Sequence, residues 1–120
     1  MSTKGAGFRY GNTNQTATDH INYQWAKDFN SNTLKKHFDE HGSQMNTATM
    51  NDYAAKAVHF ANTINREDCV SFIDGNGSTY KYNKETNELA IISKNGYVIT
   101  YFSPKNGYTY YKNERIRKKR

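Results

Sequence analysis

The chain has 120 residues, a single cysteine and a formal net charge of +6. This length suits one domain with a modest core, and Cys69 as the only cysteine excludes an intramolecular disulfide and a multi-cysteine zinc cage. Neither a long apolar run nor the apolar stretch of a secretory signal occurs, so we expect no membrane span and no self-directed export.

Most of the positive charge lies at the C-terminal end. Residues 112–120 hold six Lys or Arg and one Glu, whereas residues 1–111 carry a net charge of only +1. Such an end is typical of a solvated, disordered tail, in which Arg117 and Lys118 would add sequence-independent affinity for phosphates. The charge therefore supports a nucleic-acid function without establishing one.

Residues 1–30 are rich in Gly, Asn and Thr and show no sustained period, which predicts a linker or loosely docked arm. Trp25 and Phe29 are four residues apart and fit the start of an amphipathic helix that anchors this arm. The first firm helix is predicted to be capped by Ser31 or Asn32, to run to His41 and to stop at Gly42.

A second helix is marked more strongly. Thr49 and Asp52 form a pattern that resembles a capping box, and His59 falls off the apolar stripe, so we expect it to face solvent. The residues at helical spacing that define the stripe are Tyr53, Ala57, Phe60, Ala61 and Ile64.

From Cys69 onward the period changes to two, with turn residues between the runs. The pair Asn95-Gly96 favours a tight hairpin. The predicted strands are CVSFI (69–73), TYKYN (79–83), ELAIIS (88–93) and YVITYFS (97–103), with YTYYK (108–112) as a possible fifth strand at the edge. We therefore predict an α+β fold, in which an N-terminal arm and two helices pack on a four- to five-stranded antiparallel meander. The predicted divisions are an arm (1–30), a domain (31–111) and a basic tail (112–120).

His41 is the most informative candidate for chemistry. At about 100° per residue, Leu34 and Phe38 define an apolar stripe; His41 falls within roughly 40° of its centre and His37 near its edge. An imidazole suits proton transfer near neutral pH. The pattern fits equally a partly buried histidine that hydrogen-bonds a backbone carbonyl.

Alternation in the predicted sheet distributes the other candidates. Tyr80 and Tyr82 share one face of their strand, and Lys81 and Asn83 share the opposite one. In the last strand the same alternation places together Val98, Thr100 and Phe102. Such a surface would stack bases and hold a phosphate, although tyrosine and threonine also simply favour strands.

The sequence gives less support to a metal site or a nucleotide-binding loop. His37 and His41 have the i, i+4 spacing of helical zinc ligands, but the segment HFDEH lacks the glutamate position of HExxH and offers no obvious third ligand. We therefore expect no metal and no cofactor. No GxxxxGK loop occurs, and Cys69 lies in an apolar run typical of a small core residue.

Five segments occur in an order that resembles a known family: LKKHFDEHG, YAAKAVHFAN, TYKYNKETNELAII, NGYVITYFSP and GYTYY. Together they resemble the C-terminal toxin domains of bacterial polymorphic toxins in the barnase/EndoU/colicin D/RelE ribonuclease superfamily, with colicin D-like and contact-dependent inhibition tRNases as the nearest comparisons. The resemblance covers roughly residues 31–111. It implies a metal-independent ribonuclease, with tRNA as the expected substrate, that is secreted as part of a larger effector, delivered to the target-cell cytoplasm and neutralised in the producer by a cognate immunity protein. Whether a host factor activates it is not implied.

The resemblance also implies roles for particular residues. His41 opens the glycine step and is similar to the family's catalytic histidine, and His37 is the other histidine of that helix. Thr100 and Phe102 occupy late-strand positions where colicin D-like toxins place a hydroxyl and an aromatic ring. The hypothesis makes His41 base or acid, His37 its partner, and Lys81 with Thr100 the donors to the transition state. RNA would be held by Tyr82, Phe102, Lys35, Lys36, Arg117 and Lys118, although the two helix lysines differ in offset from those of colicin D.

Two other functions stay open at this stage. One is a non-catalytic RNA- or protein-binding module that uses the aromatic sheet and the basic tail. The other is a metal-dependent DNase toxin, which a chelator would silence.

Overall fold

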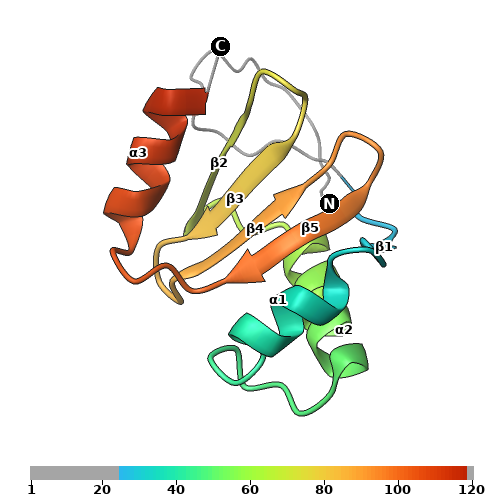
Figure 1. Ribbon diagram of the computed structural model, residues 1–120. Helices are drawn as coiled ribbons and strands as arrows, with labels where there is room; N and C mark the ends of the chain where they lie inside the picture. Colours follow the sequence, from blue (N-terminus) through green and yellow to red (C-terminus); the bar gives the residue numbers. More distant parts are fainter. Residues whose placement is uncertain (1–24, 119–120) are drawn as a thin grey trace, which may run out of the picture.

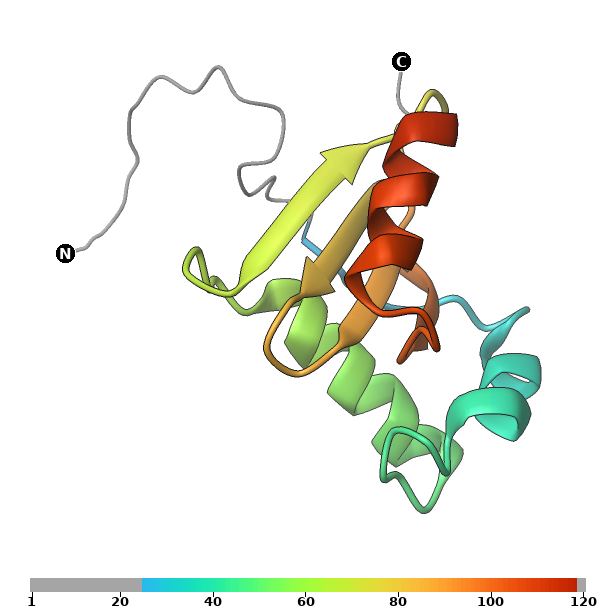
Figure 2. The same cartoon turned by 90° about the vertical axis from the view of Figure 1, so that its left-hand side faces the viewer.

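The computed structural model describes residues 25–118, which form a mixed sheet between two layers of helices (Figures 1 and 2). Helices α1 and α2 lie against one side of the sheet, and α3 covers the other. In chain order the elements are β1 (Asp28–Phe29), α1 (Leu34–His41), α2 (Met50–Asn62), β2 (Cys69–Ile73), β3 (Thr79–Asn83), β4 (Glu88–Ile92), β5 (Tyr97–Phe102) and α3 (Tyr108–Lys118). In the part of the chain described, no helix is both long and apolar enough to cross a bilayer.

The predicted α+β class is confirmed, but the sheet is not purely antiparallel. Strands β2 to β5 form the expected meander, and β1 adds to β5 in parallel, giving the order β1-β5-β4-β3-β2. The amphipathic helix expected around Trp25 and Phe29 is therefore wrong, because this segment is extended. Phe29 is 3% exposed in the core while Trp25 is 58% exposed, so β1 is held by its pairing to β5 and by one aromatic anchor.

Helix α1 ends at His41 as predicted but begins later than expected, at Leu34. Residues 31–33 form a turn, and the hydroxyl of Thr33 donates to the carbonyl of Ile99 (3.1 Å) instead of capping the helix. Gly42 keeps right-handed helical angles, so its role is steric. A Cβ at this position would lie 2.5 Å from the ring of Phe38, which packs against the core.

Helix α2 follows the prediction closely at its start, where the Thr49 hydroxyl accepts a hydrogen bond from the Asp52 amide (3.0 Å). His59 is exposed, as expected. Ile64 lies beyond the helix and is 55% exposed, so its assignment to the apolar stripe is wrong. The helix ends at Asn62, whose side-chain amide pairs with both backbone groups of Ala26 and ties α2 to the segment before β1.

Helix α3 replaces the fifth strand expected at residues 108–112 and also contains residues 112–118, where a disordered tail was expected. Both predictions are wrong for one reason. The tyrosines of this segment also fit helical spacing, and Tyr108 and Tyr111, three residues apart, both stack on Tyr82 in β3 (centroids 5.7 Å). Tertiary packing therefore selects the helix over the local strand preference of tyrosine. Residues 1–24 of the predicted arm and residues 119–120 of the predicted tail lie outside the described part.

A bulge in β5 changes which of its residues share a face of the sheet, so the predicted faces of this strand are wrong. Ile91 pairs with Thr100 whereas Ile92 pairs with Val98, so Ile99 is an extra residue. Val98 consequently joins the core beneath α1 and α2, while Thr100 and Phe102 face the other side. The predicted faces of β3 are confirmed, and so is Cys69 as a core residue.

Candidate functional site

The candidate site lies where α1 meets the free edge of β5. β1 pairs with β5 only as far as Val98, which leaves the end of the strand open to α1. The side chain of Gln44, just after α1, makes two hydrogen bonds to the backbone of Ser103 (both 2.9 Å). This edge contact places the histidines of α1 beside the side chains of β5.

Both histidines of α1 contact β5. Nδ1 of His37 and Oγ1 of Thr100 lie 3.1 Å apart and share a hydrogen bond. The ring of His41 stacks on Phe102, with centroids 5.2 Å apart and planes 27° from parallel. The two imidazoles also stack on each other, at 5.8 Å and 16°. The structure thus brings together four of the predicted residues: His37, His41, Thr100 and Phe102.

The two imidazoles are partly shielded but not sealed. Their side chains are 18% exposed for His37 and 24% for His41. Burial lowers the pKa of His37, with a further contribution from the nearby His41, and burial also lowers the pKa of His41, against the opposing effect of Glu40. Both shifts favour the neutral form of the ring, which can accept a proton.

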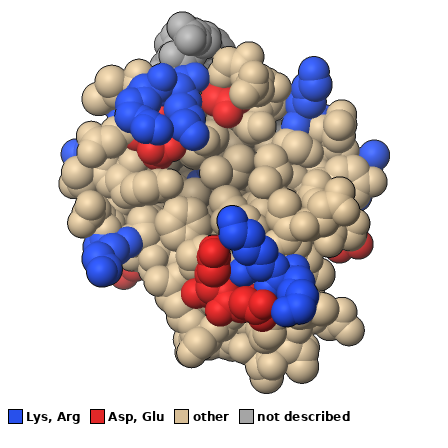
Figure 3. Space-filling model, viewed as in Figure 1, with Lys and Arg blue, Asp and Glu red and all other residues tan. Residues whose placement is uncertain are grey.

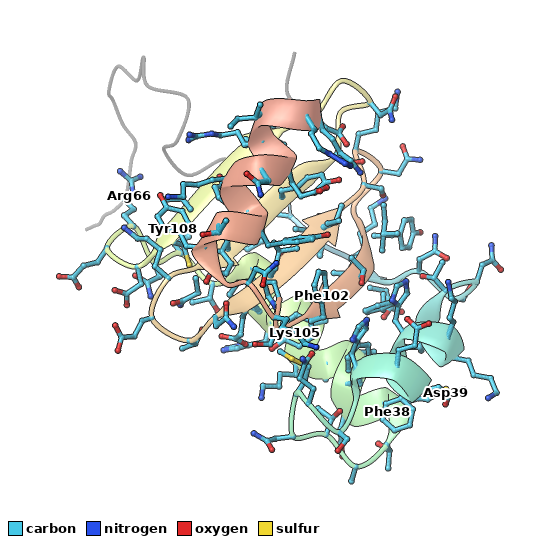
Figure 4. All side chains as sticks on the ribbon, turned by 60° about the vertical axis from the view of Figure 1, so that its left-hand side comes forward. Phe38, Asp39, Arg66, Phe102, Lys105 and Tyr108 are labelled. Atoms are coloured by element: carbon cyan, nitrogen blue, oxygen red, sulfur yellow. The ribbon has the colours of Figure 1, made fainter. Side chains whose placement is uncertain are left out.

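A row of rings continues from α1 to α3. Beyond Phe102 the ring of Tyr110 approaches edge-on, with centroids 5.6 Å apart. We call His37, His41, Phe102 and Tyr110 the aromatic ladder; Figure 4 shows Phe102 between α1 and α3. Tyr110 is half-buried, and burial raises the pKa of its hydroxyl. Sequence reasoning missed Tyr110 because it assigned the segment to an edge strand.

Glu40 is the second residue that sequence reasoning missed. Its Oε1 lies 3.6 Å from Nε2 of His41 and 4.0 Å from Nδ1 of His37, and its side chain is 49% exposed. The expectation of no third ligand beside the histidines therefore does not hold, because Glu40 stands three residues after His37 on the same helix. That i, i+3 spacing was the available signal.

Lys81 does not belong to this site. It pairs through Ala90 with Tyr101, so it faces α2, whereas Thr100 faces the other side of the sheet. Its ammonium is buried and donates to the carbonyl oxygens of Phe60 (2.8 Å) and Thr63 at the end of α2. Burial lowers its pKa. The register that the predicted role required is absent, and Lys81 acts as a C-terminal cap.

Tyr82, which was predicted to bind RNA, also lies outside this site. It is 2% exposed beneath α3, stacked on Tyr108 and Tyr111, and its hydroxyl donates to Asn87 (2.6 Å). No face of its ring is available to a base, because α3 covers the surface that was expected to bind RNA.

The predicted RNA-binding cations lie on two helices, α1 and α3. Figure 3 shows basic side chains gathered at two ends of one face, with acidic side chains beside them at both ends. Lys35 and Lys36 are exposed on α1, where Lys35 pairs with Asp39 (2.9 Å). Arg117 and Lys118 lie on the last turn of α3, within 3.5 Å and 3.4 Å of Glu114. A hydrogen bond to Tyr80 raises the pKa of Lys118. The surface between the two charged clusters is uncharged in this view.

A separate hollow of about 550 Å³ lies beside α1 and contains neither histidine. Its lining residues are Phe38, Asp39, Ser43, Asn46, Thr47 and Ala48. It is therefore distinct from the aromatic ladder.

No protein-family model matches the chain, and no curated protein matches it significantly.

Proposed function

We propose that this chain is an endoribonuclease that cleaves RNA, with tRNA as the expected substrate, by metal-independent attack of a ribose 2′-hydroxyl on the adjacent phosphate. One observation carries the proposal: His37 is hydrogen-bonded to Thr100 while His41, stacked on His37, lies over Phe102. Two partly exposed imidazoles with a hydroxyl beside them are the groups that such a reaction needs. The resemblance to the barnase/EndoU/colicin D/RelE toxins supports the same reading.

The proposed reaction transfers two protons, one from the attacking 2′-hydroxyl and one to the leaving 5′-oxygen. One imidazole accepts the proton of the 2′-hydroxyl as the 2′-oxygen bonds to phosphorus. The bond from phosphorus to the 5′-oxygen breaks, and the other imidazole gives its proton to that oxygen, acting from the protonated form that its lowered pKa disfavours. The products are a 2′,3′-cyclic phosphate and a free 5′-hydroxyl. Thr100 is assigned to orient His37 and to donate to the crowded phosphorane.

The bases on either side of the cleaved bond are assigned to the aromatic ladder. Phe102 and Tyr110 are both partly exposed, whereas Tyr82 is covered. Phe102 lies next to His41, and Tyr110 lies next to Phe102. Stacking on aromatic rings is the common way in which proteins hold single-stranded RNA. The charged clusters lie on α1, which carries His37 and His41, and on the last turn of α3, which carries Tyr110, so they suit contacts to the phosphate backbone. Single-stranded loops are therefore the favoured substrate.

The same proposal places the domain in a secreted antibacterial effector that acts in the target-cell cytoplasm, with a cognate immunity protein as its partner. An inhibitor that covers the ladder has to offset the flanking cations, so an acidic contact surface is expected on that partner. Expression of the chain in a bacterial cytosol should be toxic, and co-expression of the neighbouring open reading frame should relieve the toxicity. Growth unaffected by the chain would argue against the toxin role.

The test of the activity is incubation of the purified chain with total tRNA in excess EDTA. Wild-type protein should produce fragments, and His41→Ala should reduce the rate by at least about 100-fold while retaining the circular dichroism spectrum and RNA affinity. His59→Ala is the matched control, since His59 is an exposed histidine on α2, and it should cleave as fast as wild type.

Two outcomes separate the other candidate functions. A mobility shift without fragments identifies a binding module. Cleavage that EDTA abolishes identifies a metal-dependent nuclease, for which the cluster of His37, Glu40 and His41 would be the ligand set.

A further inference from the structure

His37, Glu40 and His41 lie on one side of α1, because residues three and four apart are neighbours on a helix. One ligand atom from each residue lies within 4.8 Å of the other two. Two imidazoles and a carboxylate form a known zinc ligand set, which leaves a fourth position open. All three side chains are reachable from solvent, so an ion can enter without unfolding the helix.

We propose that these three residues form a Zn²⁺ site whose occupation inhibits cleavage. The inhibitory part rests on the proposed function, since the same two imidazoles are assigned to move protons there. A nitrogen whose lone pair is bound to zinc cannot accept a proton, so metal binding and catalysis exclude each other at this site.

Zinc binding requires the three ligand atoms to move closer together and one imidazole ring to turn. Zinc holds its nitrogen and oxygen ligands at about 2.0–2.2 Å, which brings ligand atoms to roughly 3.4 Å from one another. The distances from Glu40 Oε1 to Nε2 of His41 and Nδ1 of His37, 3.6 Å and 4.0 Å, are already close to this value. Because Nδ1 of His37 shares a hydrogen bond with Thr100, zinc bound at that nitrogen has to replace this bond. The two rings are 16° from parallel, so one of them must turn for both lone pairs to meet one ion. The torsion that turns a histidine ring is broad.

The ring that turns most readily is His41, which is the more exposed of the two and makes no hydrogen bond to β5 in the contacts described above. Turning it removes its stacking on Phe102. Zinc therefore both occupies the imidazole and displaces it from the aromatic ladder, where the RNA is proposed to bind.

The neighbouring carboxylate supplies a matched control. Asp39 is paired with Lys35 at 2.9 Å and projects from α1 away from Phe102 (Figure 4). Glu40→Gln and Asp39→Asn each remove one negative charge from the same helix, but only the first removes a proposed ligand.

Isothermal titration calorimetry of the full chain with zinc chloride tests the site without reference to catalysis. Wild type should bind one zinc ion, Glu40→Gln should weaken binding at least tenfold, and Asp39→Asn should stay within twofold of wild type. The absence of saturable binding, or equal losses in the two variants, would overturn the site. Circular dichroism checks that both variants keep their helices.

Zinc titration of RNA cleavage then tests the inhibition. Half-maximal inhibition should fall at the calorimetric dissociation constant, should shift in Glu40→Gln by the same factor, and should be reversed by EDTA. Zinc that binds but leaves cleavage unchanged would overturn the inhibitory role. A chain that cuts no RNA with or without zinc would refute the proposed function, while calorimetry still decides the site. Cleavage that requires zinc would refute both the inhibition and the metal-independent mechanism.

Discussion

Replacing Lys81 with methionine should weaken the fold and spare the chemistry. Methionine has a similar length but cannot donate to the carbonyl oxygens of Phe60 and Thr63 at the end of α2. A buried carbonyl left without a donor costs about 1–3 kcal/mol. The Phe60 carbonyl keeps the amide of Thr63 as a donor (3.4 Å), so the loss falls mainly on the carbonyl of Thr63. Removing a buried charge offsets part of that loss. We therefore expect a net loss of about 2 kcal/mol in the free energy of unfolding, which lowers the urea midpoint by roughly 1 M.

Urea denaturation followed by circular dichroism measures the stability, and tRNA cleavage in dilute buffer measures the activity per folded molecule. Lys84→Met is the control, because Lys84 is exposed just after the same strand, and its midpoint should not move. Cleavage by Lys81→Met should stay within about twofold of wild type. A hundredfold loss of cleavage with an unchanged midpoint would refute the reasoning and return Lys81 to the catalytic site.

Substitutions at four further positions separate the site from its scaffold. Thr100→Val should slow cleavage about 100-fold with RNA affinity retained, because one donor is lost, and Thr100→Ser should restore the rate. Tyr110→Leu should weaken RNA binding in gel-shift titrations roughly tenfold by removing one stacking platform. Tyr82→Phe should cost about 1 kcal/mol of stability and leave cleavage unchanged, since only its bond to Asn87 is lost. Gly42→Ala should cost about 1–3 kcal/mol in urea denaturation, because its Cβ meets the ring of Phe38; an unchanged midpoint would contradict the close packing there.

The parts of the fold that follow from local signals were predictable. The Thr49 cap, the alternating strands and the Asn95-Gly96 turn, where Gly96 has a φ of +89°, depend on neighbours in the sequence and appear as expected. The parallel pairing of β1, the bulge at Ile99 and helix α3 depend on contacts between distant segments. The periods in the sequence do not decide these contacts, since the tyrosines of α3 fit both strand and helical spacing.

The same distinction applies to the candidate site. His37 and His41 were predicted from helical spacing, and Thr100 and Phe102 from strand alternation together with the family resemblance. Lys81 and Tyr82 lie outside the site, because their predicted roles needed an open sheet surface and α2 and α3 cover it.

Helix α3 also explains the residue that the sequence reading missed. As a helix, this segment brings Tyr110 to Phe102 while its neighbour Tyr111 stays buried. Because α3 covers one face of the sheet, the partly exposed aromatic rings lie at the edge of the sheet, beside α1.

The most direct measurement of the central claim compares two synthetic RNAs that differ by one oxygen. Once the cleaved bond is mapped, the nucleotide on its 5′ side is made as the 2′-deoxy form, and both RNAs are incubated with the chain in EDTA. The all-ribose RNA should yield a 2′,3′-cyclic phosphate and a 5′-hydroxyl, and the deoxy RNA should bind with similar affinity but remain intact. Cleavage of the deoxy RNA at the same bond would contradict attack by the 2′-hydroxyl, and with it the assigned roles of His37 and His41.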